Sequence, residues 1–452
     1  MHKFEMILNE IVAFIWGIPL VILLVGGGAF FVLHSRLIAY RYLTFAFRIA
    51  FGKQQKTPRS QGDLGHFQAL MLALSGTLGL GNISGVAVAI TLGGAGAIFW
   101  MWVTALVGIT TKFYTATLAV KFRGLDRSGE MQGGPMYVIR EGLGKQWLPL
   151  AWMFCIGCML GTLPIYQINQ LVQVLREFVA IPLGMATFKE HLYFDLGTGI
   201  ILCILITRVV LGKLSRLSAI TSQMVPIMVI LYFAMTFVLL ILNANQIPHV
   251  VGSIFLGAFS ADSVVGGAVG TIILIGVQRG AFSNEAGIGT ESMAHGASDT
   301  KEPIREGLVA SIGPVIDTLL VCTCTAIAIL ATGALNSGLT GVSLTAQAFE
   351  MSFPGVGGLL VVLIVFFLST STVLAFSYYG KKCAEFIGGR KLQNIYGWFY
   401  LLLIIFGAVS SLSVVINLID IMYAVMAIPT MISTLLLANK VKDEAAHYLK
   451  DK

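Results

Sequence analysis

Four hydroxyl side chains in a row, Ser369 to Thr372, interrupt an apolar stretch in the last quarter of the chain. Hydroxyl oxygens are hard ligands of the kind that Na⁺ prefers, as other hard cations do. Serine and threonine inside a helix also donate hydrogen bonds back to a carbonyl one turn earlier. The run therefore has two interpretations, a cation site or hydroxyls that satisfy their own backbone.

A glycine-rich segment, Ser75-Gly-Thr-Leu-Gly-Leu-Gly-Asn-Ile-Ser-Gly85, lies in the second apolar stretch. Its glycines allow backbone conformations that a continuous helix forbids. Freed N–H groups at a half-helix start suit a carboxylate, and freed carbonyls suit Na⁺. The other interpretation is a close-packing face of small residues. Thr77 and Asn82 in the middle of the apolar stretch favour a binding site.

Amide and carboxyl side chains occur inside other apolar stretches. Gln167 and Gln170 are three residues apart and share one helical face. Buried amides are costly unless they are paired, so these face the protein interior. They recognise a substrate or join helices by hydrogen bonds, and the sequence leaves both open. Asp317 is an intramembrane acid, which is functional by default or holds a neighbouring backbone in place.

The elements that must position these side chains are membrane-spanning helices. Hydrophobic residues make up 56% of the 452 residues and charged residues only 11%, far from the composition of a soluble domain. The sequence predicts an all-α polytopic membrane protein with about eleven spans of the length a bilayer requires. The predicted spans are 11–33, 66–92, 96–120, 147–175, 196–212, 217–243, 255–295 (interrupted), 307–333, 356–380, 394–410 and 413–438.

Positive charge is distributed unevenly between the predicted loops. With the N-terminus outside, 25 of the 29 Lys and Arg residues fall on the cytoplasmic side, and the outer loops 244–254 and 334–355 have none. We therefore expect a multi-pass protein of the cell (inner) membrane, N-terminus outside and C-terminus cytoplasmic. The net charge of +7 needs no nucleic-acid partner. Cys155 and Cys158 are interpreted as helix-packing residues, not as a metal or redox pair.

The spans 66–92 and 255–295 are both rich in glycine and polar side chains and lie five spans apart, entering the membrane from opposite faces. Two interrupted spans in corresponding positions predict an inverted-repeat transporter with its site where the broken helices meet. The expected organisation is an N-terminal helix and basic loop (1–65), a first repeat (66–243), a second repeat (244–438) and a tail (439–452).

One long motif supplies a family resemblance. The stretch Gly93-Gly-Ala-Gly-Ala-Ile-Phe-Trp-Met-Trp-Val-Thr-Ala-Leu-Val-Gly108 resembles the characteristic block of the alanine or glycine:cation symporters, also called sodium:alanine symporters. Companion motifs extend the resemblance over nearly the whole chain: Gly81-Asn82-Ile83, Arg279-Gly-Ala-Phe-Ser-Asn-Glu-Ala-Gly287, Ile316-Asp317-Thr318 and Ser377-Tyr-Tyr-Gly380. The resemblance implies a five-plus-five inverted repeat of neurotransmitter:sodium symporter type with one extra N-terminal helix.

The resemblance also implies where the cargo binds. A substrate carboxylate would meet the backbone amides of Leu80 and Gly81, beside Asn82. The second helix break would fall near Gly266 and Gly267, with a rival at Gly276–Gly280. Asn284 and Glu285 look more like a gate or a structural pair than substrate ligands.

By the same resemblance, the sodium ligands come from the first break and the hydroxyl run: Ser75, Leu78, Leu368, Ser371 and Thr372. Thr372 also borders the substrate pocket, and Phe376, one turn later, forms its wall.

Three positions depart from the family pattern. Leu80 stands where many members have Thr, which removes a hydroxyl but keeps the backbone contact. Phe376 replaces the usual Trp and bears on cargo size. Thr115 replaces a Glu, so Lys112 needs another partner or must snorkel towards the cytoplasm.

These observations predict a secondary active transporter that carries a small neutral amino acid with Na⁺ by alternating access. The alternatives are an amino-acid-binding membrane sensor and an uncoupled or H⁺-coupled carrier. The chain has no H-E-x-x-H, G-x-S-x-G or P-loop motif, so we expect no enzyme activity and no cofactor besides Na⁺ as coupling ion. The expected partners are the amino acid, Na⁺ and the lipid bilayer. Oligomeric state does not follow from the sequence.

Overall fold

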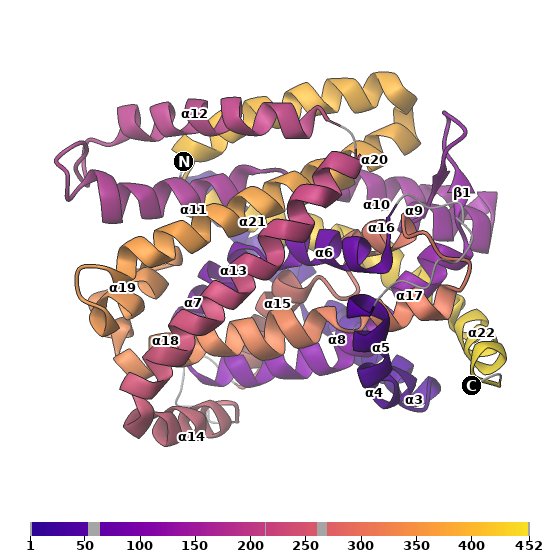
Figure 1. Ribbon diagram of the computed structural model, residues 1–452, viewed down its shortest axis with the longest axis horizontal. Coiled ribbons are helices and arrows are strands. Elements are labelled where there is room, and N and C mark those ends of the chain that lie inside the picture. Colours follow the sequence, from indigo (N-terminus) through magenta and orange to yellow (C-terminus); the bar gives the residue numbers. More distant parts are fainter. Residues whose placement is uncertain (1, 53–63, 213, 260–268, 451–452) are drawn as a thin grey trace.

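The computed structural model describes residues 2–52, 64–212, 214–259 and 269–450. Most long helices run along the horizontal axis of Figure 1, as in a bundle that crosses a membrane in that direction. The chain begins with five helical segments: α1 (His2–Ile15), α2 (Ile18–Val21), α3 (Gly27–His34), α4 (Ile38–Arg41) and α5 (Leu43–Phe51). A small antiparallel hairpin, β1 (Gly124–Leu125) and β2 (Met131–Gln132), precedes α9 (Pro135–Tyr137) at one end of the bundle.

The first interrupted span consists of α6 (His66–Thr77) and α7 (Ser84–Gly93), with a 3-10 turn at Leu80–Asn82 between them. The two halves are bent by 57°. The break falls on the glycine-rich segment in which the sequence predicts it.

The continuous helices of the first half are α8 (Gly96–Lys121), α10 (Leu148–Gly161), α11 (Ile165–Leu175), α12 (Leu192–Val210) and α13 (Leu214–Leu242). The second half contains α14 (Ile247–Gly257), α15 (Val269–Asn284), α16 (Thr290–Gly296), α17 (Pro303–Ala310), α18 (Thr323–Thr332), α19 (Val342–Ser352), α20 (Gly357–Val409), α21 (Leu412–Leu436) and α22 (Ala438–Lys450). A π-helical segment, Val315–Cys322, precedes α18.

Within the described residues, each of the eleven predicted spans overlaps helix; of the interrupted span 255–295, residues 260–268 lie outside the described part. Among the described residues, seven helices are long and apolar enough to cross a membrane, or eight if the bent pair is counted as one span. The predicted spans 356–380 and 394–410 both lie within α20, which kinks at Gly389 (φ 71°). The all-α polytopic fold is therefore confirmed.

Among the described residues, the second interruption lies at a position that the sequence does not predict. Helix α15 is continuous from Val269 to Asn284, so the rival break at Gly276–Gly280 is wrong. A Cβ at Gly276 would lie 2.5 Å from the Trp100 Cβ, and one at Gly280 would lie 3.0 Å from the Thr104 Cβ. These glycines serve close packing against α8. Gly266 and Gly267 lie outside the described residues.

The observed break spans residues 285–289, between α15 and α16. Three of its residues have left-handed backbones: Glu285 (φ 54°), Gly287 (φ 84°) and Gly289 (φ 98°). Helix α16 packs against α6, and α15 packs against α7. The two interrupted spans therefore lie together half by half, as an inverted-repeat arrangement requires.

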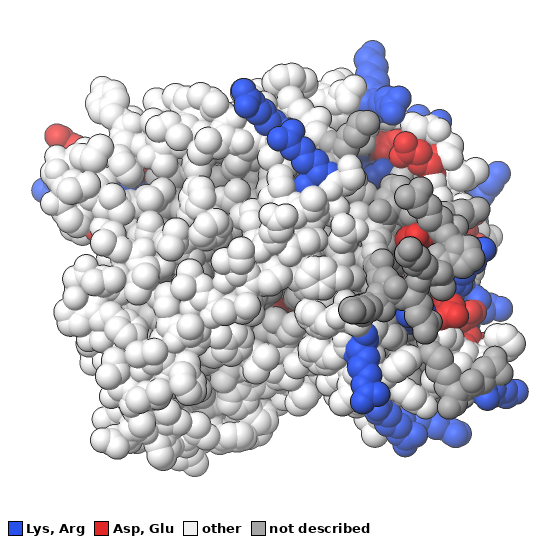
Figure 2. Space-filling model, in the orientation of Figure 1, with Lys and Arg blue, Asp and Glu red and all other residues white. Residues whose placement is uncertain are grey.

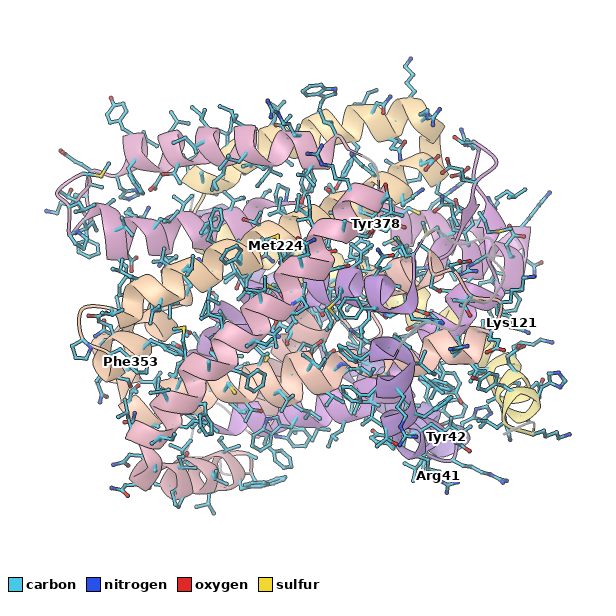
Figure 3. The ribbon with its side chains drawn as sticks, viewed as in Figure 1. Arg41, Tyr42, Lys121, Met224, Phe353 and Tyr378 are labelled. Atoms are coloured by element: carbon cyan, nitrogen blue, oxygen red, sulfur yellow. The ribbon has the colours of Figure 1, made fainter. Side chains whose placement is uncertain are left out.

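The helices differ in how much of their surface faces outward. The most apolar stretch of α8 is 83% buried inside the protein, whereas that of α12 is only 28% buried. Exposed apolar side chains on α12 and α13, such as Ile204, Ile230 and Phe237, suit contact with lipid. Side chains fill the interior between the helices, with Tyr378 among them (Figure 3).

Charged side chains gather at one end of the molecule on the face shown in Figure 2. Arg41 and Lys121 lie at this end, opposite Phe353 (Figure 3), and α22 lies there too (Figure 1). The 25 Lys and Arg residues counted on the cytoplasmic side of the predicted topology include Arg279, and that assignment is wrong. Arg279 lies inside α15, is 4% exposed and forms an ion pair with Asp420.

Candidate functional site

The first helix break carries the candidate site. Leu78 closes α6 with a hydrogen bond from its N–H to the Leu74 carbonyl, 2.6 Å long. The Gly79 N–H donates to the Thr77 carbonyl at 2.8 Å, and that of Leu80 donates to Gln167 Oε1 on α11, 3.2 Å away. The Leu80 N–H, which we predict to bind the substrate carboxylate, thus donates to a side-chain oxygen in this conformation.

Thr372 and Gln167 meet the break at Gly79. A Cβ at position 79 would lie 2.7 Å from Thr372 Oγ1 and 3.4 Å from Gln167 Nε2. Thr372 is fully buried, and its hydroxyl has no hydrogen-bond partner among the described residues. The structure therefore brings the first break, α11 and the hydroxyl run of α20 to one place.

The other proposed sodium ligands behave differently from Thr372. The Ser75 hydroxyl donates to the Leu72 carbonyl at 2.8 Å, and the Ser371 hydroxyl donates to the Leu368 carbonyl at 3.0 Å. These bonds match the interpretation in which hydroxyls satisfy their own helix. Each hydroxyl keeps lone pairs, and both residues, like Leu78, are fully buried.

Gln170 is engaged in joining helices. Its Oε1 accepts from the Ser84 hydroxyl at 2.6 Å and from the Val342 N–H at 3.1 Å. Its Nε2 donates to Asn169 Oδ1 and Gln173 Oε1. Gln170 thus links α7, α11 and α19, and its contacts favour interhelical bonding over cargo recognition.

A second group of oxygens surrounds the end of the break. Asn82 Nδ2 donates to the Asp317 backbone carbonyl at 2.9 Å, while Thr325 Oγ1 donates to the Asn82 carbonyl at 2.7 Å. Thr77 lies close to the Asp317 carboxylate, but no hydrogen bond of normal geometry joins them. Thr77 Oγ1, Asn82 Oδ1 and Asp317 Oδ2 are buried and have no hydrogen-bond partner among the described residues.

These free oxygens are unusual because buried polar atoms are nearly always paired. Asp317 also lies in a π-helical segment, a feature common at functional sites. The sequence singled out Asp317 and Asn82 separately, but not that one binds the other across 235 residues.

Aromatic rings pack against the first break, where a Cβ at Gly76 would lie 3.1 Å from Tyr379 Cε2. Phe376 is 3% exposed and stands 6.4 Å from the Tyr379 ring, centroid to centroid. A Cβ at Gly81 would lie 3.2 Å from Phe282 Cδ1. The Phe282 ring contacts the rings of Tyr166 and Tyr423, each at 5.3 Å. Sequence reasoning missed Phe282, since nothing but its place in the companion motif marks it.

The second break is surrounded by ionisable groups. Glu285 accepts hydrogen bonds from the Tyr423 hydroxyl, at 2.9 Å, and from the Thr290 hydroxyl. Lys112 is 2% exposed and lies close enough to Glu285 and Asp317 to interact with both carboxylates. These contacts suit the prediction that Glu285 is part of a gate or structural pair.

The departure at position 115 has a local explanation. The Thr115 hydroxyl donates to Glu291 Oε1 on α16 at 3.1 Å. A carboxylate from α16 thus lies within hydrogen-bond distance of position 115, where the family resemblance leads us to expect a Glu. Lys112 itself packs against Gly313, where a Cβ would lie 3.1 Å from its Nζ.

Comparison with known proteins agrees with this architecture. The model of the sodium:alanine symporter family matches residues 1–452. The sodium/alanine symporter AgcS of Methanococcus maripaludis is 40% identical, covering 98% of this chain and 96% of its own. The probable sodium/glutamine symporter GlnT of Bacillus subtilis is 32% identical, covering 97% of this chain and 89% of its own.

A likeness in fold extends to a solved structure. MhsT in complex with L-phenylalanine superposes with a TM-score of 0.60 at 13% identity, covering 83% of this chain and 89% of MhsT. The family match and the 40% identity to AgcS cover almost every residue, including both interrupted spans. The chain belongs to the sodium:alanine symporter family.

Proposed function

We propose that the chain carries a small neutral amino acid, of the alanine or glycine type, together with Na⁺ by alternating access. The observation that carries this proposal is the group of buried, unpaired oxygens at the first break: Thr77 Oγ1, Asn82 Oδ1, Asp317 Oδ2 and Thr372 Oγ1. Among the described residues nothing satisfies these oxygens, and Thr372 Oγ1 is the one that the proposed sodium site uses, so it gains from binding a hard cation.

The amino acid would bind next to these oxygens. Its carboxylate would replace Gln167 Oε1 as the acceptor of the Leu80 N–H. Leu80 is fully buried, and Phe282 packs against the next residue, Gly81, which suits a small side chain. Gly81 and Asn82 would complete the substrate contacts.

The sodium ion would bind Thr372 Oγ1, Ser371 Oγ and the carbonyls of Ser75, Leu78 and Leu368. One charge moving inward down 100 mV supplies about 2.3 kcal/mol, which is enough to concentrate a neutral cargo. We also propose that the N-terminus is outside and the C-terminus cytoplasmic. The basic loops and the charged end of the bundle support this orientation (Figure 2).

Uptake of labelled alanine into proteoliposomes tests the proposal. We expect accumulation with an inward Na⁺ gradient and none when K⁺ replaces Na⁺ on both sides. Equal uptake in both conditions would instead indicate an uncoupled or H⁺-coupled carrier. Binding of alanine without any uptake would indicate a sensor.

A further inference from the structure

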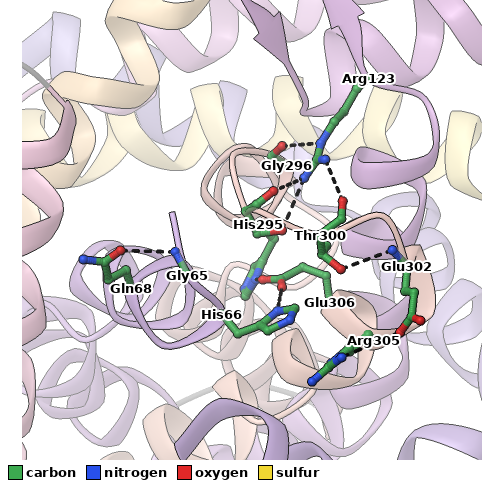
Figure 4. A network of polar contacts seen from close by, with 11 residues as sticks. Gly65, His66, Gln68, Arg123, His295, Gly296, Thr300, Glu302, Arg305 and Glu306 are labelled. Atoms are coloured by element: carbon green, nitrogen blue, oxygen red, sulfur yellow. Dashed lines mark hydrogen bonds and ion pairs between the residues drawn. The ribbon is translucent and has the colours of Figure 1, made fainter. Parts of the chain in front are cut away.

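Three side chains from three helices meet at the inner ends of both interrupted spans. His66 is the first residue of α6, His295 lies in the last turn of α16, and Glu306 lies on α17. His66 Nδ1 is 2.5 Å from Glu306 Oε2, and His295 Nδ1 is 2.7 Å from Glu306 Oε1 (Figure 4). One carboxylate thus joins the two inner half-helices, one through each oxygen.

The backbone reinforces this junction. The Leu64 N–H donates to the Ala297 carbonyl at 3.2 Å, and the Asp299 N–H donates to the Leu64 carbonyl at 2.5 Å. Arg123 donates to the carbonyls of Gly296 and Thr300 at 2.7 and 3.0 Å, and also to Ser298 (Figure 4). The segments before α6 and after α16 are therefore held to each other and to the end of α8.

The side chains of this group are buried, so the charge on Glu306 needs partners inside the protein. The Glu306 side chain is 0% exposed, that of His295 is 1% exposed and that of His66 is 12% exposed. A buried carboxylate is stable only if charged or strongly polar donors satisfy it. Protonated histidines are such donors, and histidine is the side chain whose charge ordinarily changes between about pH 5 and 8.

Other charged side chains surround this group of three. Burial lowers the pKa of the Arg123 guanidinium, while Glu306 and Asp299 raise it, and arginine stays charged throughout. Arg305 and Glu302 form a pair at 3.8 Å near the surface. The other charged or titratable residues on helices packed against α17 are Arg48 of α5, Lys112, Tyr114 and Lys121 of α8, Glu291 of α16, and Lys440, Lys442, Asp443, Glu444, His447, Tyr448 and Lys450 of α22. Of these, His447 is the one histidine, the side-chain type that ordinarily changes charge between about pH 5 and 8. Within the described residues, the ion pairs of Glu306 are those with the two histidines.

We propose that His66, Glu306 and His295 form a proton-binding latch that holds the cytoplasmic ends of the two interrupted helices together. A proton on either imidazole strengthens its bond to the carboxylate, and separating α6 from α16 breaks that bond. Opening is thus linked to proton release, so acid on the cytoplasmic side favours the closed state and rising pH favours opening. The consequence for transport, slower release of cargo into an acidic cytoplasm, rests on the proposed function.

Hydrogen exchange of the protein in lipid nanodiscs, without cargo, tests the latch directly. Exchange over 66–77 and 290–296 would be measured at pH 6, 7 and 8 and corrected for the intrinsic pH dependence of amide exchange. We expect the corrected rate to rise with pH, by up to about tenfold per pH unit for each proton released. A corrected rate that does not change with pH in the unmodified protein would overturn the proposal.

Two variants and a control sharpen the test. His66→Gln keeps an amide donor for Glu306 but cannot take up a proton, so the pH dependence should weaken while the protein stays folded. Glu306→Gln should abolish it. Glu302→Gln, in the exposed pair four residues away, should leave it intact. Unchanged pH dependence in both His66→Gln and Glu306→Gln would refute the latch.

The outcome does not depend on whether the transport proposal is right. A pH-dependent exchange rate with no alanine uptake would support the latch proposal and contradict the transport proposal. Na⁺-driven uptake with pH-independent exchange would support the transport proposal and contradict the latch proposal.

Discussion

The two helix breaks differ in the side chains that surround their interrupted backbone. At the first break, the backbone and hydroxyl groups face neutral side chains such as Gln167 and Thr372, with one carboxylate, Asp317, at its far end. At the second break, they face charged residues, with Glu285 bound by two hydroxyls and close to Lys112. The first break keeps unpaired oxygens, whereas the carboxylate of Glu285 has both of its oxygens bonded.

This difference indicates that the two breaks have different roles, one fixed and one that responds to a ligand. At the second break, Asn284 Nδ2 and Glu291 Oε2 are also buried without a hydrogen-bond partner among the described residues. The Glu285 carboxylate is nevertheless satisfied by the protein's own hydroxyls, so its position does not depend on a ligand and it can act as a fixed point. The unpaired oxygens at the first break gain a partner only when a ligand arrives, so binding can change its conformation. The second break would thus anchor the movement that the first break initiates.

Removing the charge at the second break should have the largest effect. In Glu285→Ala the hydroxyls of Tyr423 and Thr290 lose a buried acceptor and Lys112 loses a nearby counter-charge. We expect a loss of stability on the order of 3 kcal/mol, seen as a thermal midpoint lowered by several degrees in detergent.

The matched control for that experiment is Tyr423→Phe, which removes one hydrogen bond to the same carboxylate. Its cost should be about 1 kcal/mol. An unchanged midpoint in Glu285→Ala would show that the second break is not held by its charges.

The next effect belongs to the first break. In Thr372→Ala the proposed sodium site loses one oxygen ligand, and the removed hydroxyl leaves no partner unpaired. We expect the half-saturating Na⁺ concentration for alanine uptake to rise about tenfold, which corresponds to about 1.4 kcal/mol.

Thr370 lies in the same hydroxyl run but about 200° around the helix, so Thr370→Ala serves as the control. Its Na⁺ requirement should remain that of the unmodified protein. Equal shifts in both variants would mean that the run acts through helix stability, and the comparison between the breaks would lose its support.

The first break could be predicted because its signal is local. Glycines alternate with polar side chains within the eleven residues from Ser75 to Gly85, inside an otherwise apolar span. The second break could not be placed in this way. Gly276 and Gly280 look equally suited to a break, but they serve the approach of α8, and only the folded chain distinguishes the two uses.

Long-range contacts explain the rest of what sequence reasoning missed. The bond from Leu80 to Gln167 spans 87 residues, and the contact of Gly81 with Phe282 crosses between the two interrupted helices. Local periodicity assigned Gln167 to an inward face but could not say which backbone group it meets. The charge pattern likewise placed Arg279 in a loop, because its buried partner Asp420 is 141 residues away.

The smallest predicted effect distinguishes two roles for Gln167. If the cargo carboxylate displaces its Oε1 from the Leu80 N–H, then Gln167→Leu removes a competitor and leaves that amide unpaired until cargo binds. A net hydrogen bond contributes about 0.5–1.5 kcal/mol, so alanine should bind about threefold more tightly at saturating Na⁺, measured by calorimetry. Gln173→Leu, two turns along α11 and bonded to Ser343 and Glu177, should not change the affinity. Weaker binding in Gln167→Leu would mean that this amide contacts the cargo itself. The first break would then present its site fully formed rather than exchange one acceptor for another.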